Sequence, residues 1–503
     1  MLTQIPENRT IPIDLTQDEF KKLGHQLIDR ISELLYGIAE HPVTSGESPE
    51  KIQELLETGR NLPEEGMDPE ALLNHACQLL FNHSLFNGHP KFWGYVTSSA
   101  APLGILGDLL ASGVNANVGA YALSPMATEM ERQTITWIGE FLGYPAGGGL
   151  MVSGGNMANY VGFMASIRAK TGLDIRKEGL KNYPRTLVCY CSEQTHTWVH
   201  KAADLFGLGT EQIRWIPTLP DFSMDTKSLE MKISEDIKSD FLPFLVIGTA
   251  GTVSLGVVDP LEQISEICRK NQLWFHIDGA YGGLAAAVPE FEPGIELINR
   301  ADSIAVDPHK WLYAPLEAGC VLVKDPAKLS DTFSYHPVYY NFDNAEVNYV
   351  DYGFQNSRGF RALKVWLTLQ QMGKKGYRQL IREDILLARA AYELLSGTEE
   401  IEVFTWHLSI TTFRYVPENL PGGLDESGKL EYLNLLNKEL LDAIQAGGEF
   451  FVSHAMIGEI FVLRLCIVNF RTTIKDIKAL PGFIVNKGKE LNSALQFEGR
   501  IGP

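Results

Sequence analysis

Residues 304–320 read IAVDPHKWLYAPLEAGC, and this stretch gives the main indication of the fold. It begins with an apolar run typical of a buried strand, which Asp307-Pro308 brings to an end. Lys310 follows at once. A proline and a lysine here have an ordinary explanation, a solvated surface turn. The alternative is a lysine at the carboxyl end of a parallel strand, the edge at which open α/β sheets bind their ligands.

Four further apolar segments, together with SIAVD (303–307), are expected to be strands. They are TLVCYC (186–191), FLVIGTA (244–250), LWFHID (273–278) and GCVLVK (319–324). Helical segments such as LEQISEICRKNQ lie between them. Near-continuous apolar strands that alternate with helices predict an α/β domain whose mostly parallel sheet is covered on both faces. We place this large domain at residues 86–375.

The two ends of the chain have different patterns. Residues 1–85 contain amphipathic helical segments, whose apolar stripes need a surface to cover in the same molecule or in a partner subunit. Beyond residue 375, VFTWHLSITTFRYV (403–416) and EIFVLRLCIVNFR (459–471) are expected to be strands that flank a helix ending at Gly447-Gly448. Residues 376–503 are therefore expected to form a small α+β domain.

Composition narrows the classes of function. The 503 residues are 45% hydrophobic and carry a formal net charge of −19. These values indicate a well-packed globular protein and argue against nucleic acid or an anionic membrane as a partner. Neither a signal peptide nor a membrane span is apparent. Six cysteines are scattered along the chain, as in proteins of the reducing cytoplasm, and we expect no metal site.

Several polar residues follow the predicted strands. In GLMVSGGNMANYVGFMASIRAK (149–170), small residues at a helix start leave backbone N–H groups free to bind phosphate, although they also suit a tight turn. Asp278 ends the strand LWFHID, where a buried carboxylate is costly unless it is paired. His196 stands where a strand gives way to a helix, and a purely structural histidine is the common alternative there.

A second polar stretch, NYVDYGFQNSRGFRALKVW (348–366), precedes a long amphipathic helix. Its ordinary interpretation is a loop with aromatic residues and a solvated arginine. A phosphate cradle, a strand-end aspartate and a strand-end lysine together are what pyridoxal phosphate (PLP) requires. The phosphate anchors the cofactor, the carboxylate keeps the ring nitrogen protonated, and the lysine forms a Schiff base.

From about residue 15 to 480 the chain resembles the PLP-dependent group II decarboxylases, and among them the aromatic L-amino acid decarboxylases. The resemblance is carried by HPKFWGYVTSSAAP, LSPMATEMERQTITWIG, VSGGNMAN, CSEQTHTW, FHIDGAYGG, DPHKW and NSRGFRALKVW. It implies the aspartate-aminotransferase-like PLP fold (fold type I) and a homodimer with active sites at the interface. It also implies decarboxylation of a small-molecule L-amino acid.

The resemblance assigns a role to each candidate residue. Lys310 forms the Schiff base, Asp278 pairs with the ring nitrogen, and His196 stacks on the ring and faces the substrate. The other cofactor contacts that it implies are Gly155, Asn156, Thr249, Asp307, His309 and, from the neighbouring subunit, Ser357. The chain departs from many relatives at Met157, where they carry Glu.

Substrate and product are the remaining expectations. Tyr95, Val96 and Ser98 occupy the substrate-pocket wall of the family, and the absence of a basic residue in that stretch favours an aromatic amino acid of the tyrosine, dopa, tryptophan or phenylalanine type. Tyr349, or alternatively Tyr352, is expected to return a proton to the substrate carbon. Three alternatives remain open: a decarboxylase of glutamate, aspartate or cysteine sulfinate, an aromatic aldehyde synthase, and a cofactor-binding or scaffolding protein without turnover.

Overall fold

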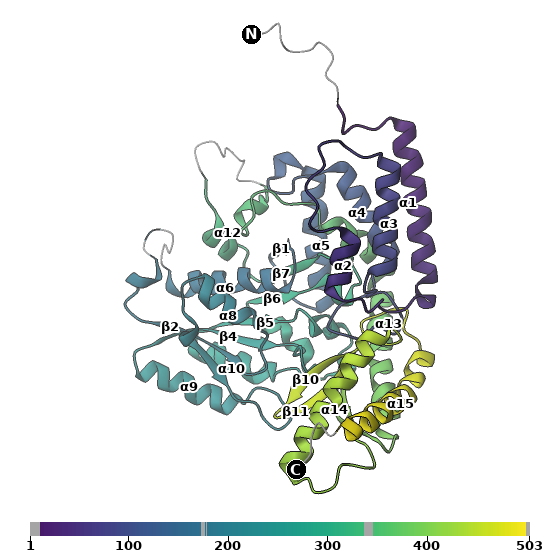
Figure 1. The fold of residues 1–503 in the computed structure, drawn as a ribbon. Helices are drawn as coiled ribbons and strands as arrows, with labels where there is room; N and C mark the ends of the chain where they lie inside the picture. Colours follow the sequence, from purple (N-terminus) through teal and green to yellow (C-terminus); the bar gives the residue numbers. More distant parts are fainter. Residues whose placement is uncertain (1–10, 173–176, 178, 337–345, 499–503) are drawn as a thin grey trace.

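The computed structural model describes residues 11–172, 177, 179–336 and 346–498, and a seven-stranded sheet lies at its centre (Figure 1). The strand order is β1-β7-β6-β5-β4-β2-β3. β7 runs antiparallel to both of its neighbours, and the other pairs are parallel. The strands are β1 (Gly148–Val152), β2 (Leu187–Ser192), β3 (Ile213–Ile216), β4 (Leu242–Thr249), β5 (Trp274–Asp278), β6 (Ser303–Val306) and β7 (Gly319–Val323). The prediction of a mostly parallel sheet is confirmed.

Helices cover this sheet on both faces. Every residue of β2, β6 and β7 is buried. Because successive side chains of a strand point to opposite faces, complete burial requires cover on both sides. The covering helices are α5 (Pro125–Leu142), α6 (Gly155–Thr171), α8 (Trp198–Leu205), α9 (Thr226–Lys238) and α10 (Leu261–Asn271).

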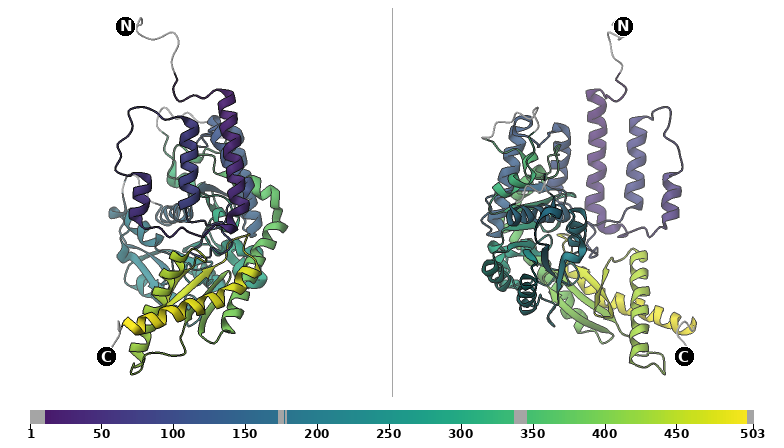
Figure 2. Two further views of the ribbon diagram at one scale, coloured as in Figure 1. Left: turned by 45° about the vertical axis from the view of Figure 1, so that its right-hand side comes forward. Right: turned by 90° about the vertical axis from the view of Figure 1, so that its left-hand side faces the viewer.

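The N-terminal helices form an arm beside this body. They are α1 (Gln17–Gly37), α2 (Pro49–Leu56) and α3 (Pro69–His83). The next helix, α4 (Pro102–Val114), packs on the body instead. Thr16 and Glu19 form a capping box at the start of α1. Every side chain of α1 remains at least partly exposed. Figure 2 shows α1, α2 and α3 standing together at one side of the molecule, where they pack mainly on each other.

The C-terminal part contains a four-stranded antiparallel sheet of order β10-β11-β9-β8. Its strands are β8 (Ile401–His407), β9 (Ile410–Tyr415), β10 (Ser453–Ile457) and β11 (Ile460–Cys466). The helices α13 (Ala362–Ser396), α14 (Glu426–Gly447) and α15 (Ile474–Glu498) pack on it around a separate hydrophobic core. α14 ends as predicted, with Gly448 in the left-handed region at φ 72°.

One strand prediction is wrong in this part of the chain. Residues 403–416 were expected to be a single strand, but the structure has a hairpin in which β8 pairs with β9. Leu408 makes the turn with φ 49°. A leucine seldom adopts this left-handed conformation, so the sequence contains no ordinary turn signal there.

The predicted division into residues 1–85, 86–375 and 376–503 stays a prediction. The boundary at 375 falls inside α13, two residues beyond Gly373, where φ 59° and ψ 176° interrupt the helical backbone. In the part of the chain that the structure describes, none of the helices combines the length and apolar character needed to cross a membrane.

Candidate active site

A cavity of about 580 Å³ opens at the carboxyl edge of the parallel strands. β4 ends at Thr249, β5 ends at Asp278, and the turn after β6 leads through Asp307 to Lys310 on the single-turn helix α11 (Pro308–Trp311). Parallel strands end at the same sheet edge, which brings these distant residues together. The predicted site residues that line the cavity are Tyr95, Val96, Gly155, Asn156, His196, Thr249, Asp278, Asp307, His309 and Lys310.

Lys310 is held by the turn that carries it. Its Nζ lies 2.9 Å from Asp307 Oδ2, three residues earlier. Asp307 is buried, and its Oδ1 finds no hydrogen-bond partner among the described residues. On the same turn, the Nδ1–H of His309 donates to the Ala318 carbonyl oxygen at 2.7 Å, and burial lowers the pKa of His309. The turn therefore presents a paired lysine and a neutral imidazole.

Asp278 is buried and hydrogen-bonded through both of its oxygens. The indole Nε1–H of Trp198 donates to Oδ2 at 2.7 Å, and the backbone N–H of Ala280 donates to Oδ1 at 3.2 Å. A buried carboxylate is costly unless it has such partners. These two bonds fix the orientation of the carboxylate at the end of β5.

His196 lies on the cavity wall between β2 and α8. Its Nδ1 accepts the backbone N–H of Trp198 at 3.3 Å. Desolvation lowers the pKa of His196, although the nearby charge of Asp278 opposes the shift. The imidazole is therefore neutral near pH 7, and its proton resides on Nε2.

The start of α6 forms an anion cradle. In the described structure no side chain caps its first N–H groups, which the helix dipole makes attractive to an anion. A Cβ at Gly155 would lie 2.8 Å from Asp307 Oδ2 and 2.9 Å from the Ala280 Cβ, so only glycine leaves this space open. Asn156 follows it in the first turn.

Thr249 closes another side of the cavity. Its backbone N–H donates to Asp259 Oδ2 at 2.8 Å, and Asp259 also accepts the Met224 N–H at 2.9 Å. Burial raises the pKa of Asp259 to about 6. The Thr249 hydroxyl is buried, and within the described part of the chain it has no hydrogen-bond partner.

A guanidinium group that the sequence did not single out also lines the cavity. Arg464 on β11 donates to the carbonyl oxygens of Ser254 and Tyr95 at 3.1 and 3.0 Å, and to Ser453 Oγ at 3.1 Å. It is only 3% exposed, and its Nη2 is left without a partner among the residues described. A charged residue within the apolar run VLRLC was the signal that could have identified it.

Four predicted residues lie outside the cavity lining. Ser98 donates from Oγ to the His309 carbonyl oxygen at 2.7 Å, and so supports the lysine turn from behind. Ser357 is exposed on the surface of the single chain.

Tyr349 and Tyr352 are the other two, and neither is at the cavity. Tyr349 is only 2% exposed within the main core, and its ring contacts that of Tyr352 edge to face. Burial raises the pKa of Tyr349 well above its ordinary value and also raises that of Tyr352. The structure therefore gives no support to Tyr349 as the proton donor, because its hydroxyl is enclosed by the core.

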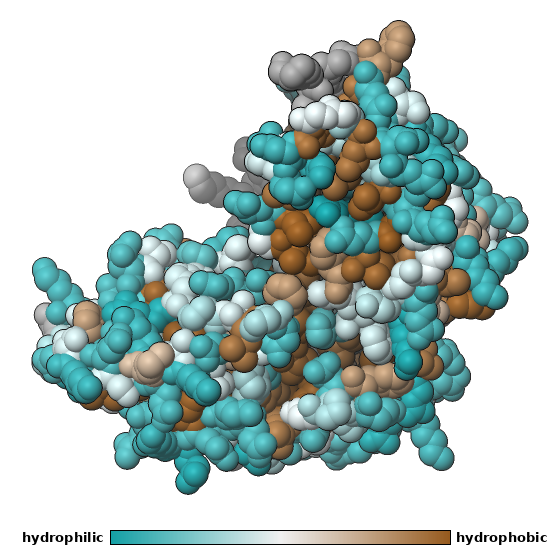
Figure 3. Space-filling view, turned by 90° about the horizontal axis from the view of Figure 1, so that it is seen from below, coloured by the Kyte–Doolittle hydropathy of each residue, from teal (hydrophilic) through white to brown (hydrophobic). Residues whose placement is uncertain are grey.

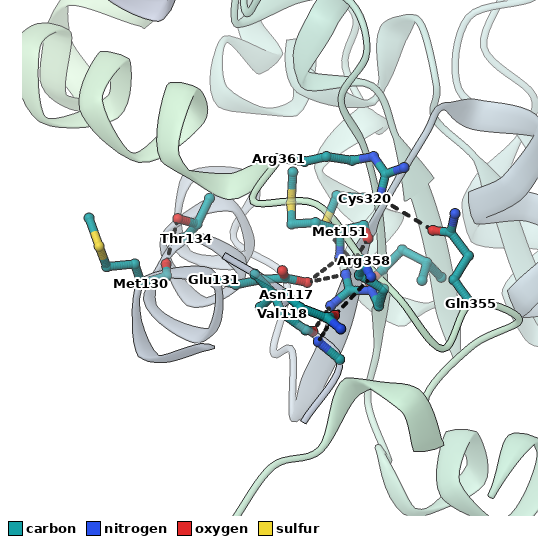
Figure 4. A network of polar contacts seen from close by, with 12 residues as sticks. Asn117, Val118, Met130, Glu131, Thr134, Met151, Cys320, Gln355, Arg358 and Arg361 are labelled. Atoms are coloured by element: carbon teal, nitrogen blue, oxygen red, sulfur yellow. Dashed lines mark hydrogen bonds and ion pairs between the residues drawn. The ribbon is translucent and has the colours of Figure 1, made fainter. Parts of the chain in front are cut away.

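Arg358 holds the segment that contains Tyr349 and Tyr352 in place through a network of polar contacts (Figure 4). Its guanidinium donates to Glu131 Oε1 at 2.6 Å and to the carbonyl oxygens of Met151 and Val118 at 2.6 and 2.8 Å. It also lies 4.8 Å from the centre of the Tyr349 ring. The side chains of both Arg358 and Glu131 are fully or almost fully buried, at 2% and 0% exposure. The network ties the segment to β1, which leads into the α6 cradle.

Comparison with known proteins places the chain in a family. Residues 49–416 match the model of the pyridoxal-dependent decarboxylase conserved domain. The aromatic-L-amino-acid decarboxylase of Bacillus atrophaeus is 34% identical over 92% of this chain and 94% of its own length. A phenylacetaldehyde synthase from a Rosa hybrid cultivar is 30% identical over 92% of each chain. The crystal structure of Oryza sativa TDC with PLP and tryptamine superimposes with a TM-score of 0.87 and 25% identity, over 96% of this chain and 100% of that one.

The chain belongs to the pyridoxal-dependent decarboxylase family. It is a PLP-dependent amino acid decarboxylase with the fold of that family. The cavity fits the cofactor, because it offers an anion cradle at α6, a buried carboxylate at Asp278 and a lysine on the α11 turn. Asp307 and Thr249 line the same cavity.

Proposed function

We propose that this protein decarboxylates an aromatic L-amino acid to the amine and carbon dioxide at the cavity around Lys310. The observation that carries the proposal is the convergence of Lys310, Asp278 and His196 on one cavity that also contains an anion cradle. When bound, PLP supplies a conjugated ring that accepts the electron pair released as carbon dioxide leaves.

Each side chain has a defined task in this proposal. Lys310 would supply the amine that binds the cofactor covalently. The N–H groups at Gly155 and Asn156 bind the phosphate, with Thr249, Asp307 and His309 nearby. Asp278 would hold a proton on the ring nitrogen, and His196 would contact the ring as a neutral imidazole. Ser357, which is exposed on one chain, approaches the site of a neighbouring subunit.

Arg464 supports an aromatic rather than an acidic substrate. Arg464 lines the cavity, where a guanidinium provides a place for one carboxylate. Every amino acid has an α-carboxylate that occupies such a place. An acidic substrate needs a second cation, and Arg464 is the one guanidinium among the described residues of the lining. Tyr95 and Val96 form the adjacent wall, which suits an aromatic ring.

A screen of substrates tests the proposal. The purified protein with PLP is given each of the twenty amino acids, L-dopa and 5-hydroxytryptophan, and carbon dioxide and amine are measured. Aromatic substrates should give both products at rates well above those of glutamate and aspartate. Release of carbon dioxide from acidic substrates alone would contradict the aromatic assignment. If the purified protein does not bind PLP, the proposal that it catalyses a PLP-dependent reaction is wrong.

An aromatic aldehyde synthase remains the second candidate. The synthase from the Rosa hybrid cultivar has the same extent of similarity along the chain, and neither Tyr349 nor Tyr352 lies at the cavity. Protonation of the substrate carbon gives the amine, whereas reaction with oxygen gives aldehyde, ammonia and peroxide. Measuring amine and aldehyde from the same reaction separates the two candidates.

We also propose a homodimer that forms in the reducing cytoplasm. Apolar side chains remain exposed on α1 and α4, including Phe20 (68%), Tyr36 (82%), Leu109 (54%) and Leu110 (54%). Hydrophobic side chains gather in and around a hollow on the face seen from below (Figure 3). Such surfaces mark sites of association. All six cysteines are free thiols, which supports a location in the reducing cytoplasm.

Analytical ultracentrifugation tests the dimer. The mass should be twice the 55.9 kDa of the chain, and a variant with glutamate at both Leu109 and Leu110 should sediment as a monomer. Leu205→Glu, at another exposed leucine (66%), is the control and should remain dimeric. A parent protein that is monomeric and fully active would contradict the proposal.

A further inference from the structure

Trp198 contacts both of the residues proposed to flank the cofactor ring. It is the first residue of α8, two positions after His196. Its indole Nε1–H donates to Asp278 Oδ2 at 2.7 Å, and its backbone N–H donates to His196 Nδ1 at 3.3 Å. Asp278 ends β5 and His196 follows β2, so a single residue links two separate strand ends.

The indole is rigidly placed. Its side chain is fully buried, and the rings of Phe163 and His276 meet it edge-on at 6.3 and 5.9 Å. His276 is itself fixed between Ser303 Oγ at 2.7 Å and Asn159 Oδ1 at 2.8 Å. Burial lowers the pKa of His276 to about 4, so its ring is neutral and adds no charge beside Asp278. The indole Nε1–H of Trp198 therefore points in one fixed direction.

We propose that Trp198 is a positioning residue, which orients the Asp278 carboxylate through its indole and fixes the His196 tautomer through its backbone. An indole has one N–H and no acceptor, so it engages one lone pair of Oδ2 and leaves the carboxylate facing the cavity in one orientation. The backbone bond leaves His196 Nε2 as the protonated nitrogen. This inference rests on the proposed placement of PLP between Asp278 and His196.

Trp198→Phe keeps an aromatic ring and removes the indole donor. A hydrogen bond to a charged group contributes enough that its loss should weaken PLP binding on the order of tenfold, as measured by titrating the cofactor-free protein. The ¹⁵N resonance of ring-labelled PLP should also move toward that of the unprotonated ring. Trp215→Phe is the control, because Trp215 packs on the same hydrophobic cluster and its ring lies tilted against that of His200 at 4.8 Å, away from the cavity lining. It should keep the parent affinity within about twofold.

A double-mutant comparison shows whether Trp198 acts through Asp278. In the Asp278→Asn background, Trp198→Phe should weaken PLP binding much less than it does in the parent. Parent affinity and an unchanged ¹⁵N resonance in Trp198→Phe, or an equal loss in Trp215→Phe, would overturn the inference. Additive losses in the double variant would overturn it as well.

A second measurement detects the hydrogen bond between Trp198 and Asp278 without the Trp198→Phe variant, which could fail to fold. Protein labelled with ¹⁵N-tryptophan has eight indoles. Trp198 and Trp311 both donate to carboxylates, at 2.7 and 2.8 Å, and should resonate downfield. Asp278→Ala should move the Trp198 signal. If every indole signal stays in place, the hydrogen bond and the inference are wrong. If the parent protein binds no PLP, the proposed function fails instead, so the two failures are distinguishable.

Discussion

Removing the guanidinium of Arg358 should destabilise the α/β core far more than removing an exposed arginine. Arg358→Met leaves Glu131 in the core with the Met151 N–H as its remaining partner among the described residues. Breaking a buried ion pair from one side costs about 3–5 kcal/mol. An unfolding entropy of about 2.1 cal/mol/K per residue over 503 residues amounts to about 1.1 kcal/mol/K. The Tm should therefore fall by about 3–5 °C if the chain unfolds as one unit.

Differential scanning calorimetry of the cofactor-free protein at pH 7 measures this effect. Arg382→Met is the control, because Arg382 pairs with Glu290 at the surface, where both side chains are about half exposed. Exposed pairs contribute about 0–1 kcal/mol, so its Tm should stay within about 1 °C of the parent. Adding Glu131→Gln to Arg358→Met removes the stranded charge and should recover part of the loss. The reasoning is refuted if Arg358→Met unfolds at the same temperature as Arg382→Met.

Three further predictions concern the site and its surroundings. Asp278→Asn should weaken PLP binding by about ten- to a hundredfold, because the neutral amide no longer holds the ring proton; unchanged affinity would remove Asp278 from the cofactor site. Burial raises the pKa of Asp384 from 3.8 to about 7. Between pH 3.8 and about pH 7 the folded state therefore binds more protons than the unfolded state. The free energy of unfolding falls by about 1.4 kcal/mol for each unit that the pH rises across this range. Asp384→Asn should accordingly raise the Tm more at pH 8 than at pH 5.5, and an equal gain at both would contradict the assignment. Tyr349→Phe should leave the amine as product, since the hydroxyl that it removes is enclosed by the core; aldehyde from this variant, but not from the other Tyr→Phe variants of residues 335–352, would restore Tyr349 as the donor.

The central sheet could be predicted because its strands are continuous apolar runs. β4 and β5, for example, were expected at 244–250 and 273–278 and are found at Leu242–Thr249 and Trp274–Asp278. A strand buried on both faces needs apolar residues at every position, which makes it visible in sequence. β3 was not predicted, because its four residues include Arg214, which is only partly buried at the sheet edge.

The site could be predicted where its residues stand directly at strand ends. Asp278 and Lys310 follow apolar runs, so their meeting at one edge follows from the parallel sheet. Arg464 and Trp198 could not be assigned, because their roles depend on contacts between distant segments. Arg464 reaches the cavity only because the C-terminal sheet packs against it, and Trp198 meets Asp278 across 80 positions of sequence.

The burial of Tyr349 could not be predicted from the sequence. A polar, glycine-containing stretch suggested an exposed loop, but the buried pair of Arg358 and Glu131 holds it in the core. The sequence contains no periodicity that reports such a pair, since each partner lies in a different element. The remaining tyrosines of residues 337–345, Tyr339 and Tyr340, lie outside the described residues, and the Tyr→Phe scan covers them.

Locating the covalently bound cofactor tests the central claim most directly. The protein is incubated with PLP, reduced with borohydride, digested, and its peptides are identified by mass spectrometry. We expect a single modified lysine, Lys310, and the loss of covalent attachment in Lys310→Ala. Lys364→Ala, at a lysine on α13 that pairs with Asp108, should leave the attachment intact. PLP attached to a different lysine, or retained covalently in Lys310→Ala, would contradict this expectation.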